Sequence, residues 1–482
     1  MRFPGSAVVA LVLSVSLATP LWAQTPVDPL TQIALEEIPG DFAEAMAEAA
    51  AARAQFFAGD HAAALEVLRP MADAGNPVAQ NIVGVALTDL NAAYGPYDGD
   101  TGFAYLLAAA EQSFGPAMHN LGIAYEEAHE SSPPNLEEAF RWFHAAAELG
   151  YEFAFYDTAH ALVNGNGVEA DVAAGRVWAE RALEGPERAP ALMLLGDLAY
   201  YGEGQEVDYE QSLDLYLQAA EAGSPHAAFA AAYQYYWAEG TSENDAAAIP
   251  LLEQAVAGDI REAFGYLAYL LQEDVGDTPA DLPRAFALAM EGDALGDGYA
   301  SYVLGDLYRM GIGVEEDYDL ARAAYTRSYD SGNVNGLVEL AEMAYAGQGE
   351  PEDHERALAM FLDAYEMLPD YAHIPYSIGF MQMRGEGTEV DLASATTFLE
   401  QAMAQRHWLS MLEGIELYGS PTYAGPQSDP VRARAHCLYM YANDWVPEEE
   451  EIQIDHVATC ERLQAELSAE DQARAAEMAA AF

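Results

Sequence analysis

The chain has 482 residues, of which 79 are acidic and 19 are arginine or lysine, and its formal net charge is -60 at pH 7. The sequence contains no lysine, so a phosphate-loop lysine and a Schiff-base lysine are excluded. A polyanion of this size is repelled by nucleic acid and by anionic lipid, and we expect neither as a partner. We attribute the charge mainly to solvation of helix surfaces; binding of cations or of a basic partner is the alternative.

The N-terminal segment has the pattern of an export signal. Arg2 supplies a positive start, residues 7–17 are almost wholly apolar, and a small residue, Ala23, precedes a plausible cleavage point. Cleavage after Ala18 is the alternative. The apolar run is shorter than the roughly 20 residues that span a bilayer. We therefore predict a cleaved signal peptide over 1–23 and a periplasmic or secreted mature chain that does not insert into a membrane.

Beyond this segment, similar stretches recur along the chain. LGDLAYYGEG at 195–204 matches LGDLYRMGIG at 304–313, and each is followed by an acidic turn and an aromatic-bearing helix. A period of about 36 residues is typical of stacked helix–turn–helix units. Glycines are expected to close the second helices, because a left-handed residue commonly ends a helix. These closing glycines are predicted at Gly75, Gly115, Gly150, Gly185, Gly223, Gly258, Gly296 and Gly332.

A second set of glycines forms G-x-G turns after the first helix of a unit. They lie at 165/167, 202/204, 311/313, 347/349 and 385/387. Because these turns follow helices rather than strands and lack a third glycine, we interpret them as structural turns and not as nucleotide loops. In the second helices, a small residue and an aromatic one lie four positions apart and are predicted to share a buried face. The pairs are Ala139/Phe143, Ala174/Trp178, Ala321/Tyr325 and Ala357/Phe361.

This combination of L-G-x-x-Y, G-x-G-V, an acidic turn, A-x-x-x-aromatic and A-x-x-G resembles the Sel-one-like repeat family, relatives of the tetratricopeptide repeats. The resemblance covers about residues 60–410, or nine to ten units. It implies an all-α, right-handed superhelical solenoid that binds proteins or peptides through its concave face. It further implies a scaffold or regulator, for example in the bacterial cell envelope. An acidic groove of this kind would attract basic or amphipathic partner segments.

Changes in composition divide the chain into segments. Residues 24–40 carry several prolines and are predicted to be a tether, and 41–75 to be a tetratricopeptide-like helix pair. The solenoid is expected over 76–418. A Gly-, Pro- and Ser-rich stretch then leads into 419–482, which we interpret as a helical cap, since solenoids need polar terminal caps.

The only cysteines, Cys437 and Cys460, both lie in the expected cap. In a chain directed to an oxidising compartment, an even number of cysteines on adjacent helices favours a disulfide. Two buried free thiols are the alternative.

No catalytic, cofactor-binding or metal-binding motif rises above chance in this sequence, and none of these roles is assigned to any residue. One aromatic run at 233–237 cannot face a single side of a helix. Most of its rings are expected to pack between repeats, and we single out Tyr236 and Trp237, with Tyr201, as candidate partner-binding residues.

The leading hypothesis is therefore a protein-binding scaffold without catalytic activity. One alternative is an enzyme, or an enzyme inhibitor, that acts on cell-wall material. A convergence of histidine and carboxylate side chains in a groove would favour it. The other alternative is a structural or cation-binding acidic protein. The partner's identity and the oligomeric state stay open.

Overall fold

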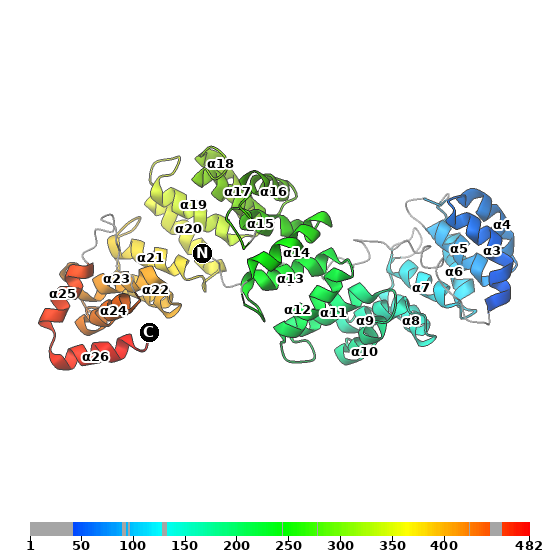
Figure 1. Cartoon of the computed structure of the whole chain (residues 1–482), viewed down its shortest axis with the longest axis horizontal. Coiled ribbons are helices and arrows are strands. Elements are labelled where there is room, and N and C mark those ends of the chain that lie inside the picture. The colour runs from blue at the N-terminus through cyan, green and yellow to red at the C-terminus, as the bar shows by residue number, and fades with distance from the viewer. Residues whose placement is uncertain are drawn as a thin grey trace. The chain divides into compact units, whose positions relative to one another are not determined.

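A computed structural model describes residues 42–88, 93–94, 97–127, 133–242, 244–276, 278–423, 425–443 and 456–482. The predicted signal peptide (1–23) and tether (24–40) lie outside the described residues. Within these ranges the regular structure is helical, without a strand. The protein is thus an all-α solenoid, as the repeat pattern predicts (Figure 1).

The chain divides into two compact units, Met1–Asp259 and Ile260–Phe482. Unit 1 contains the helices α3 (Ala43–Phe57), α4 (His61–Asp73), α5 (Pro77–Thr88), α6 (Gly99–Ala110), α7 (Gly115–Glu126), α8 (Leu136–Glu148), α9 (Ala154–Asn164), α10 (Val172–Ala182), α11 (Arg188–Tyr201), α12 (Tyr209–Glu221), α13 (Pro225–Trp237) and α14 (Asp245–Ala257).

Unit 2 contains the helices α15 (Arg261–Leu270), α16 (Leu282–Ala294), α17 (Gly298–Met310), α18 (Tyr318–Asp330), α19 (Val334–Ala346), α20 (His354–Met367), α21 (His373–Arg384), α22 (Leu392–Ala404), α23 (Trp408–Gly419), α24 (Pro430–Ala442), α25 (His456–Glu466) and α26 (Ala469–Ala479). Within each unit the helices pack chiefly on their neighbours in chain order, as in a solenoid, except that the last helix, α26, packs on α24 (Figure 1).

The acidic turns of the sequence act as helix caps. An Asp or Asn precedes each second helix, and its side-chain oxygen accepts a hydrogen bond from a backbone N–H of the first turn, which satisfies a donor that the helix leaves free. Successive caps lie 36 to 38 residues apart, a more regular marker of the repeat than the glycines. They are Asp98, Asn135, Asp171, Asp208, Asn244, Asp281, Asp317, Asp353, Asp391 and Asp429.

All five predicted G-x-G turns have both glycines in the left-handed region. The predicted closing glycines are left-handed at Gly75, Gly150, Gly223, Gly296 and Gly332. Of the other three, Gly258 does end α14 but with a φ of −99°, and Gly115 and Gly185 are not left-handed. Near two of those three, a neighbouring residue, Ser113 (φ 62) or Asp259 (φ 59), takes the left-handed conformation instead. The chain therefore reverses at the expected places, although glycine does not always make the reversal.

Small residues on the first helices make room for rings of the second helices. A Cβ added at Gly196 would lie 2.6 Å from the Tyr216 ring, and one at Gly305 would lie 2.5 Å from the Tyr325 ring. Three of the four predicted small–aromatic pairs are buried together; the exception is Ala174/Trp178. There the N-cap Asp171 sets the register, so that Gly175 and Ala179 take the buried positions.

The helices near the C-terminus share a core with the last repeats. Met383, Leu399 and Leu417 belong to one buried cluster with Met440 and Leu463. Because α24 packs on α23 and begins at a capping Asp, the hairpin pattern continues one helix beyond position 418. The final helix is capped by Ser468, whose side chain accepts a hydrogen bond from the backbone N–H of Asp471. Within the described residues, no helix has both the length and the apolar character needed to cross a membrane.

Candidate binding surface

Two of the three aromatic candidates lie at matching places in consecutive repeats. Tyr201 is the last residue of α11 and Trp237 the last residue of α13, and the next residue of each chain segment, Gly202 or Ala238, is left-handed. Both side chains are partly exposed. Tyr236, in contrast, is only 2% exposed and belongs to the core. The aromatic candidates for a surface contact thus narrow to Tyr201 and Trp237.

Other rings fix the orientation of these two side chains. The Tyr201 ring meets that of Tyr200 edge-on at 5.0 Å between centroids. The Trp237 ring lies 4.9 Å from Tyr236 and 6.0 Å from Tyr233. Edge-to-face contacts of this kind favour one ring orientation over others. The two partly exposed rings are therefore held by their buried neighbours.

Carboxylates surround the end of α11. Asp197 Oδ1 accepts a hydrogen bond from the Tyr216 hydroxyl at 2.7 Å, and burial, partly opposed by this bond, raises the pKa of Asp197 to about 7. The pKa of Tyr201 is also raised, first by burial and then by the negative charges of Asp197, Glu203 and Glu239. These three carboxylates therefore lie close enough to Tyr201 to act on its hydroxyl.

A second group of acidic side chains comes from α7, α9 and the start of α11. Burial, reinforced by the charge of Asp157, raises the pKa of Glu126 to about 8 and that of Glu187 to about 7. Asp157 Oδ2 lies 2.7 Å from Nε2 of the buried His119. Three repeats thus contribute carboxyl groups to one place, where His119 pairs with Asp157 and the charge of Asp157 also acts on His160.

Tyr156 links the two groups. Its pKa is raised by burial and then by the charges of Asp157, Asp197, Glu187 and Glu126. Since all these carboxylates act on one hydroxyl, they lie near one another along the first helices of unit 1. We call this surface the acidic face, and it comprises Glu126, Asp157, Glu187, Asp197, Glu203 and Glu239.

The corresponding helices of unit 2 carry arginines among their carboxylates. Arg309 Nη2 lies 3.3 Å from Asp306 Oδ1 and 3.5 Å from Glu339 Oε2. Farther along, Arg384 Nη2 lies 3.5 Å from Oε1 of the buried Glu413. Burial raises the pKa of Glu339 and of Glu413 to about 7, and in each case the nearby arginine opposes the shift. Asp306, Glu339 and Glu413 of unit 2 thus each have an arginine of the same chain nearby.

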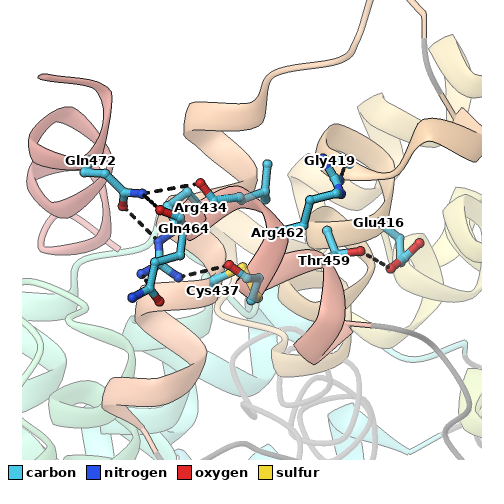
Figure 2. The surroundings of a disulfide bond; sticks show 10 residues. Glu416, Gly419, Arg434, Cys437, Thr459, Arg462, Gln464 and Gln472 are labelled. Atoms are coloured by element: carbon cyan, nitrogen blue, oxygen red, sulfur yellow. Dashed lines mark hydrogen bonds between the residues drawn. A yellow bond between two sulfur atoms is a disulfide. The ribbon is translucent and has the colours of Figure 1, made fainter. Parts of the chain in front are cut away.

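The expected cap contains a covalent link (Figure 2). Cys437 of α24 and Cys460 of α25 form a disulfide, with sulfur atoms 2.00 Å apart. Beside it, the buried Arg434 donates to the side-chain oxygens of Gln464 and Gln472 at 3.2 and 3.1 Å. The guanidinium and the disulfide together tie the last three helices to one another.

The catalytic, cofactor and metal roles remain unassigned. Among the described residues, no group of three or more His, Cys, Asp and Glu side chains is placed to hold a metal ion. Sequence reasoning missed the acidic face apart from its aromatic edge, because carboxylates are abundant everywhere in the chain. One usable signal was spacing: His119 and Asp157 lie 38 residues apart, close to one repeat, so they share a side of neighbouring first helices.

The fold and these contacts define a helical-repeat protein of the solenoid class. The Sel1 repeat model matches residues 77–114, 115–151, 156–185, 189–224, 265–289, 298–333, 335–367 and 376–407, which is more than half of the chain. The chain therefore belongs to the Sel1 repeat family. Repeats of this kind generally mediate protein–protein interactions, and scaffold proteins built from them are typically not catalysts.

Individual relatives agree with this assignment. A Sel1-like repeat-containing protein of Schizosaccharomyces pombe is 22% identical over 57% of this chain and 42% of its own length. A protein of Neisseria meningitidis serogroup B is 29% identical over 61% of this chain and 59% of its own. The matches thus span about half the length of these relatives. A protective antigen of uropathogenic Escherichia coli with the same fold superposes with a TM-score of 0.74, at 22% identity, over 93% of this chain and 92% of that one.

Proposed function

We propose that the chain is a protein- or peptide-binding scaffold or regulator of the bacterial cell envelope, and that it binds a basic partner segment through the acidic face of unit 1. The observation that carries the proposal is the group of carboxyl side chains on and beside the first helices α7, α9 and α11. Carboxyl groups of three repeats come together there, and no arginine or lysine lies between Arg188 and Arg261. Solenoids use such extended surfaces for binding.

The raised pKa values of Glu126 and Glu187 support a site that can accept a partner's cation, rather than carboxylates already neutralised by ion pairs. A buried carboxylate without a cation is costly, and the group responds by holding its proton. A guanidinium or ammonium group of a partner would stabilise the charged forms of Glu126 and Glu187. Binding would then release protons, and opposite charges would speed association at low ionic strength.

The test is a titration of the chain with a short labelled peptide that alternates arginine with serine and glycine. A triple variant, Glu126→Gln, Asp157→Asn and Glu187→Gln, should weaken binding by about tenfold or more at low salt. The matched control, Glu180→Gln, Asp214→Asn and Glu221→Gln, removes the same charges from exposed positions of α10 and α12. Equal losses in the two triple variants would show that only net charge matters and would refute the proposal.

Export to the envelope is a separate part of the proposal, and the N-terminal pattern supports it. The mass of the chain recovered from the periplasm of an expressing bacterium should equal that of residues 24–482. Retention of the full-length chain in the cytoplasm would contradict this part alone.

An enzyme acting on cell-wall material is the second candidate function. The pairing of His119 with Asp157 at 2.7 Å beside Glu126, whose raised pKa suits a proton donor, is the observation that favours it. Release of soluble fragments from purified peptidoglycan, lost in Glu126→Gln, would support this activity. No release at any pH between 5 and 8 would leave the scaffold role alone.

A further inference from the structure

The ends of α11 and α13 share features that the rest of the acidic face lacks. Tyr201 and Trp237 close these two helices at the same position of consecutive repeats, and both rings are partly exposed. A hydrogen bond of 2.7 Å runs from the Tyr200 hydroxyl to Glu239 Oε2. Because Tyr200 precedes Tyr201 and Glu239 follows Trp237 by two residues, this bond joins the two helix ends beside the two rings.

Both exposed aromatic residues carry a polar atom without a partner. Tyr201 Oη and Trp237 Nε1 are covered by protein, and neither makes a hydrogen bond within the chain. A buried donor left unsatisfied costs about 1–3 kcal/mol, so most native proteins pair such groups. Each ring is partly exposed while its donor atom is covered, so a docked chain can reach either donor only if the ring leaves the orientation that its buried neighbours favour.

The charges nearby specify what kind of chain could dock. Asp197, Glu203 and Glu239 all act electrostatically on the Tyr201 hydroxyl, and the sequence from 189 to 260 contains acidic residues but no arginine or lysine. Unit 1 also contains an example of a cation on a ring of this type, because the Arg181 guanidinium lies 4.1 Å from the centroid of Trp178. A cation over an aromatic face is favourable, and most so over tryptophan.

We propose that Tyr201 and Trp237 form an aromatic docking subsite for an extended, arginine- or lysine-bearing segment of a partner protein. The cationic side chain lies against the two rings and faces Asp197, Glu203 and Glu239, while backbone carbonyl groups of the segment accept from Tyr201 Oη and Trp237 Nε1. This inference rests on the proposed function and assigns it a specific anchor. A second copy of the chain is not the occupant, since a net charge of -60 opposes self-association.

The experiment compares single variants of the full chain by fluorescence anisotropy with the same arginine-containing peptide. Tyr201→Phe removes one donor and keeps the ring, and it should weaken binding about three- to tenfold without lowering the melting temperature. Trp237→Ala should weaken binding by about tenfold or more. The matched control is Tyr345→Phe in unit 2, where the lost hydroxyl donates to Glu386 within the chain at 2.7 Å; binding should not change.

The outcomes separate this inference from the proposed function. If the acidic-face triple variant weakens binding but Tyr201→Phe and Trp237→Ala do not, the acidic face stands and the aromatic subsite is refuted. If none of these variants affects binding, both fall. A peptide with citrulline in place of arginine should bind at least tenfold more weakly, because citrulline keeps the shape and loses the charge. Equal binding of the citrulline peptide would refute the cationic occupant, and circular dichroism confirms that each variant is folded.

Discussion

Asp197 in unit 1 and Asp306 in unit 2 occupy the same position of their repeats, but the charges around them differ. Each follows a glycine and accepts a hydrogen bond from a tyrosine 19 residues later, at 2.7 Å from Tyr216 and 2.6 Å from Tyr325. Three residues after the aspartate, however, unit 1 has Tyr200 and unit 2 has Arg309.

Because of this difference, the carboxylates of the two repeats have different partners. In unit 2 the arginine bridges Asp306 to Glu339 of the next repeat, so the carboxylates stabilise the stack. In unit 1 the tyrosine reaches Glu239 and leaves the charge of Asp197 unopposed by any cation three residues away. Where an arginine neutralises the carboxylates of its own repeat, as in unit 2, the ion pairs stabilise the stack. Where no arginine is present, the carboxylates can pair with a cation of a partner.

The largest expected effect concerns the disulfide, which unit 2 has and the described part of unit 1 lacks. Cys437→Ser with Cys460→Ser should lower the stability of unit 2 by about 3 kcal/mol, because the cross-link no longer restricts the unfolded chain. Hydrogen–deuterium exchange read peptide by peptide should show faster exchange in α23–α26 and no change in α5–α14. Equal acceleration in both units would mean that they do not unfold separately.

Arg309→Met tests whether the ion pairs of Arg309 with Asp306 and Glu339 stabilise unit 2. Removing the guanidinium leaves Asp306 and Glu339 without their cation in a mostly buried setting, and we expect a loss of about 2–3 kcal/mol in urea unfolding. Arg474→Met, at an exposed pair with Asp471, is the control and should cost less than about 1 kcal/mol. A similar cost for both substitutions would contradict the structural role of Arg309.

Tyr200→Arg introduces into unit 1 the residue type that unit 2 has at this position. The new cation would lie beside Asp197 and Glu239, and binding of the arginine peptide should weaken by about tenfold, or roughly 1.4 kcal/mol. Tyr345→Arg adds the same charge beside Glu386 in unit 2 and should leave binding nearly unchanged. If the two substitutions have equal effects, the added charge acts only through the net charge of the chain.

Mild acid should stabilise unit 1. Burial raises the pKa of Glu126 to about 8 and of Glu187 and Asp197 to about 7, while unfolded carboxyls titrate near 4. Between these values the folded state holds protons that the unfolded state has lost, so stability is fully present below about pH 4 and falls as the pH rises toward 8. We expect the melting temperature of unit 1 to be a few degrees higher at pH 5 than at pH 8.

Neutral variants isolate these three groups from the general effect of net charge. Glu126→Gln, Glu187→Gln and Asp197→Asn together should remove most of the pH dependence of unit 1. A melting curve that shifts with pH as much as that of the parent chain would show that other carboxylates are responsible.

The histidines near the C-terminus of unit 2 should oppose this trend. Burial lowers the pKa of His436 to about 3 and of His456 to about 4, against about 6.5 in the unfolded chain. Their contribution is therefore fully present above about pH 6.5 and is lost as the pH falls toward 4. His436→Phe, which keeps a ring between Tyr418 and Phe482, should reduce the loss on acidification by a degree or two. An unchanged loss would assign the effect to other groups.

The fold was largely predictable because its signals are local. Glycine pairs such as Gly202/Gly204 are needed where the backbone is left-handed, and a capping residue such as Asp208 marks the start of a helix. Trp178 shows the limit of this reasoning: its spacing of four from Ala174 predicts a shared buried face, but Asp171 begins the helix so that Gly175 and Ala179 are buried instead.

The binding surface was predictable only in part. Tyr201 and Trp237 were recognisable as aromatic residues in excess of what one helix face can bury. The sequence did not mark Glu126, Asp157 and Glu187 as members of a binding surface. They differ from other acidic residues in being partly buried and in lying near carboxylates of neighbouring repeats. That property depends on how three hairpins stack, and a single hairpin's sequence does not contain it.

The matching tyrosine–aspartate bonds of the two units also bear on how the chain grew. Since each hairpin touches little beyond its immediate neighbours, an extra copy can be inserted without redesigning a central interior. Duplication then preserves the tyrosine–aspartate hydrogen bonds, Tyr216–Asp197 and Tyr325–Asp306. The position three residues after each aspartate can change without loss of these bonds. New specificity in such a chain can arise by exchanging the residue at this one position of each copy.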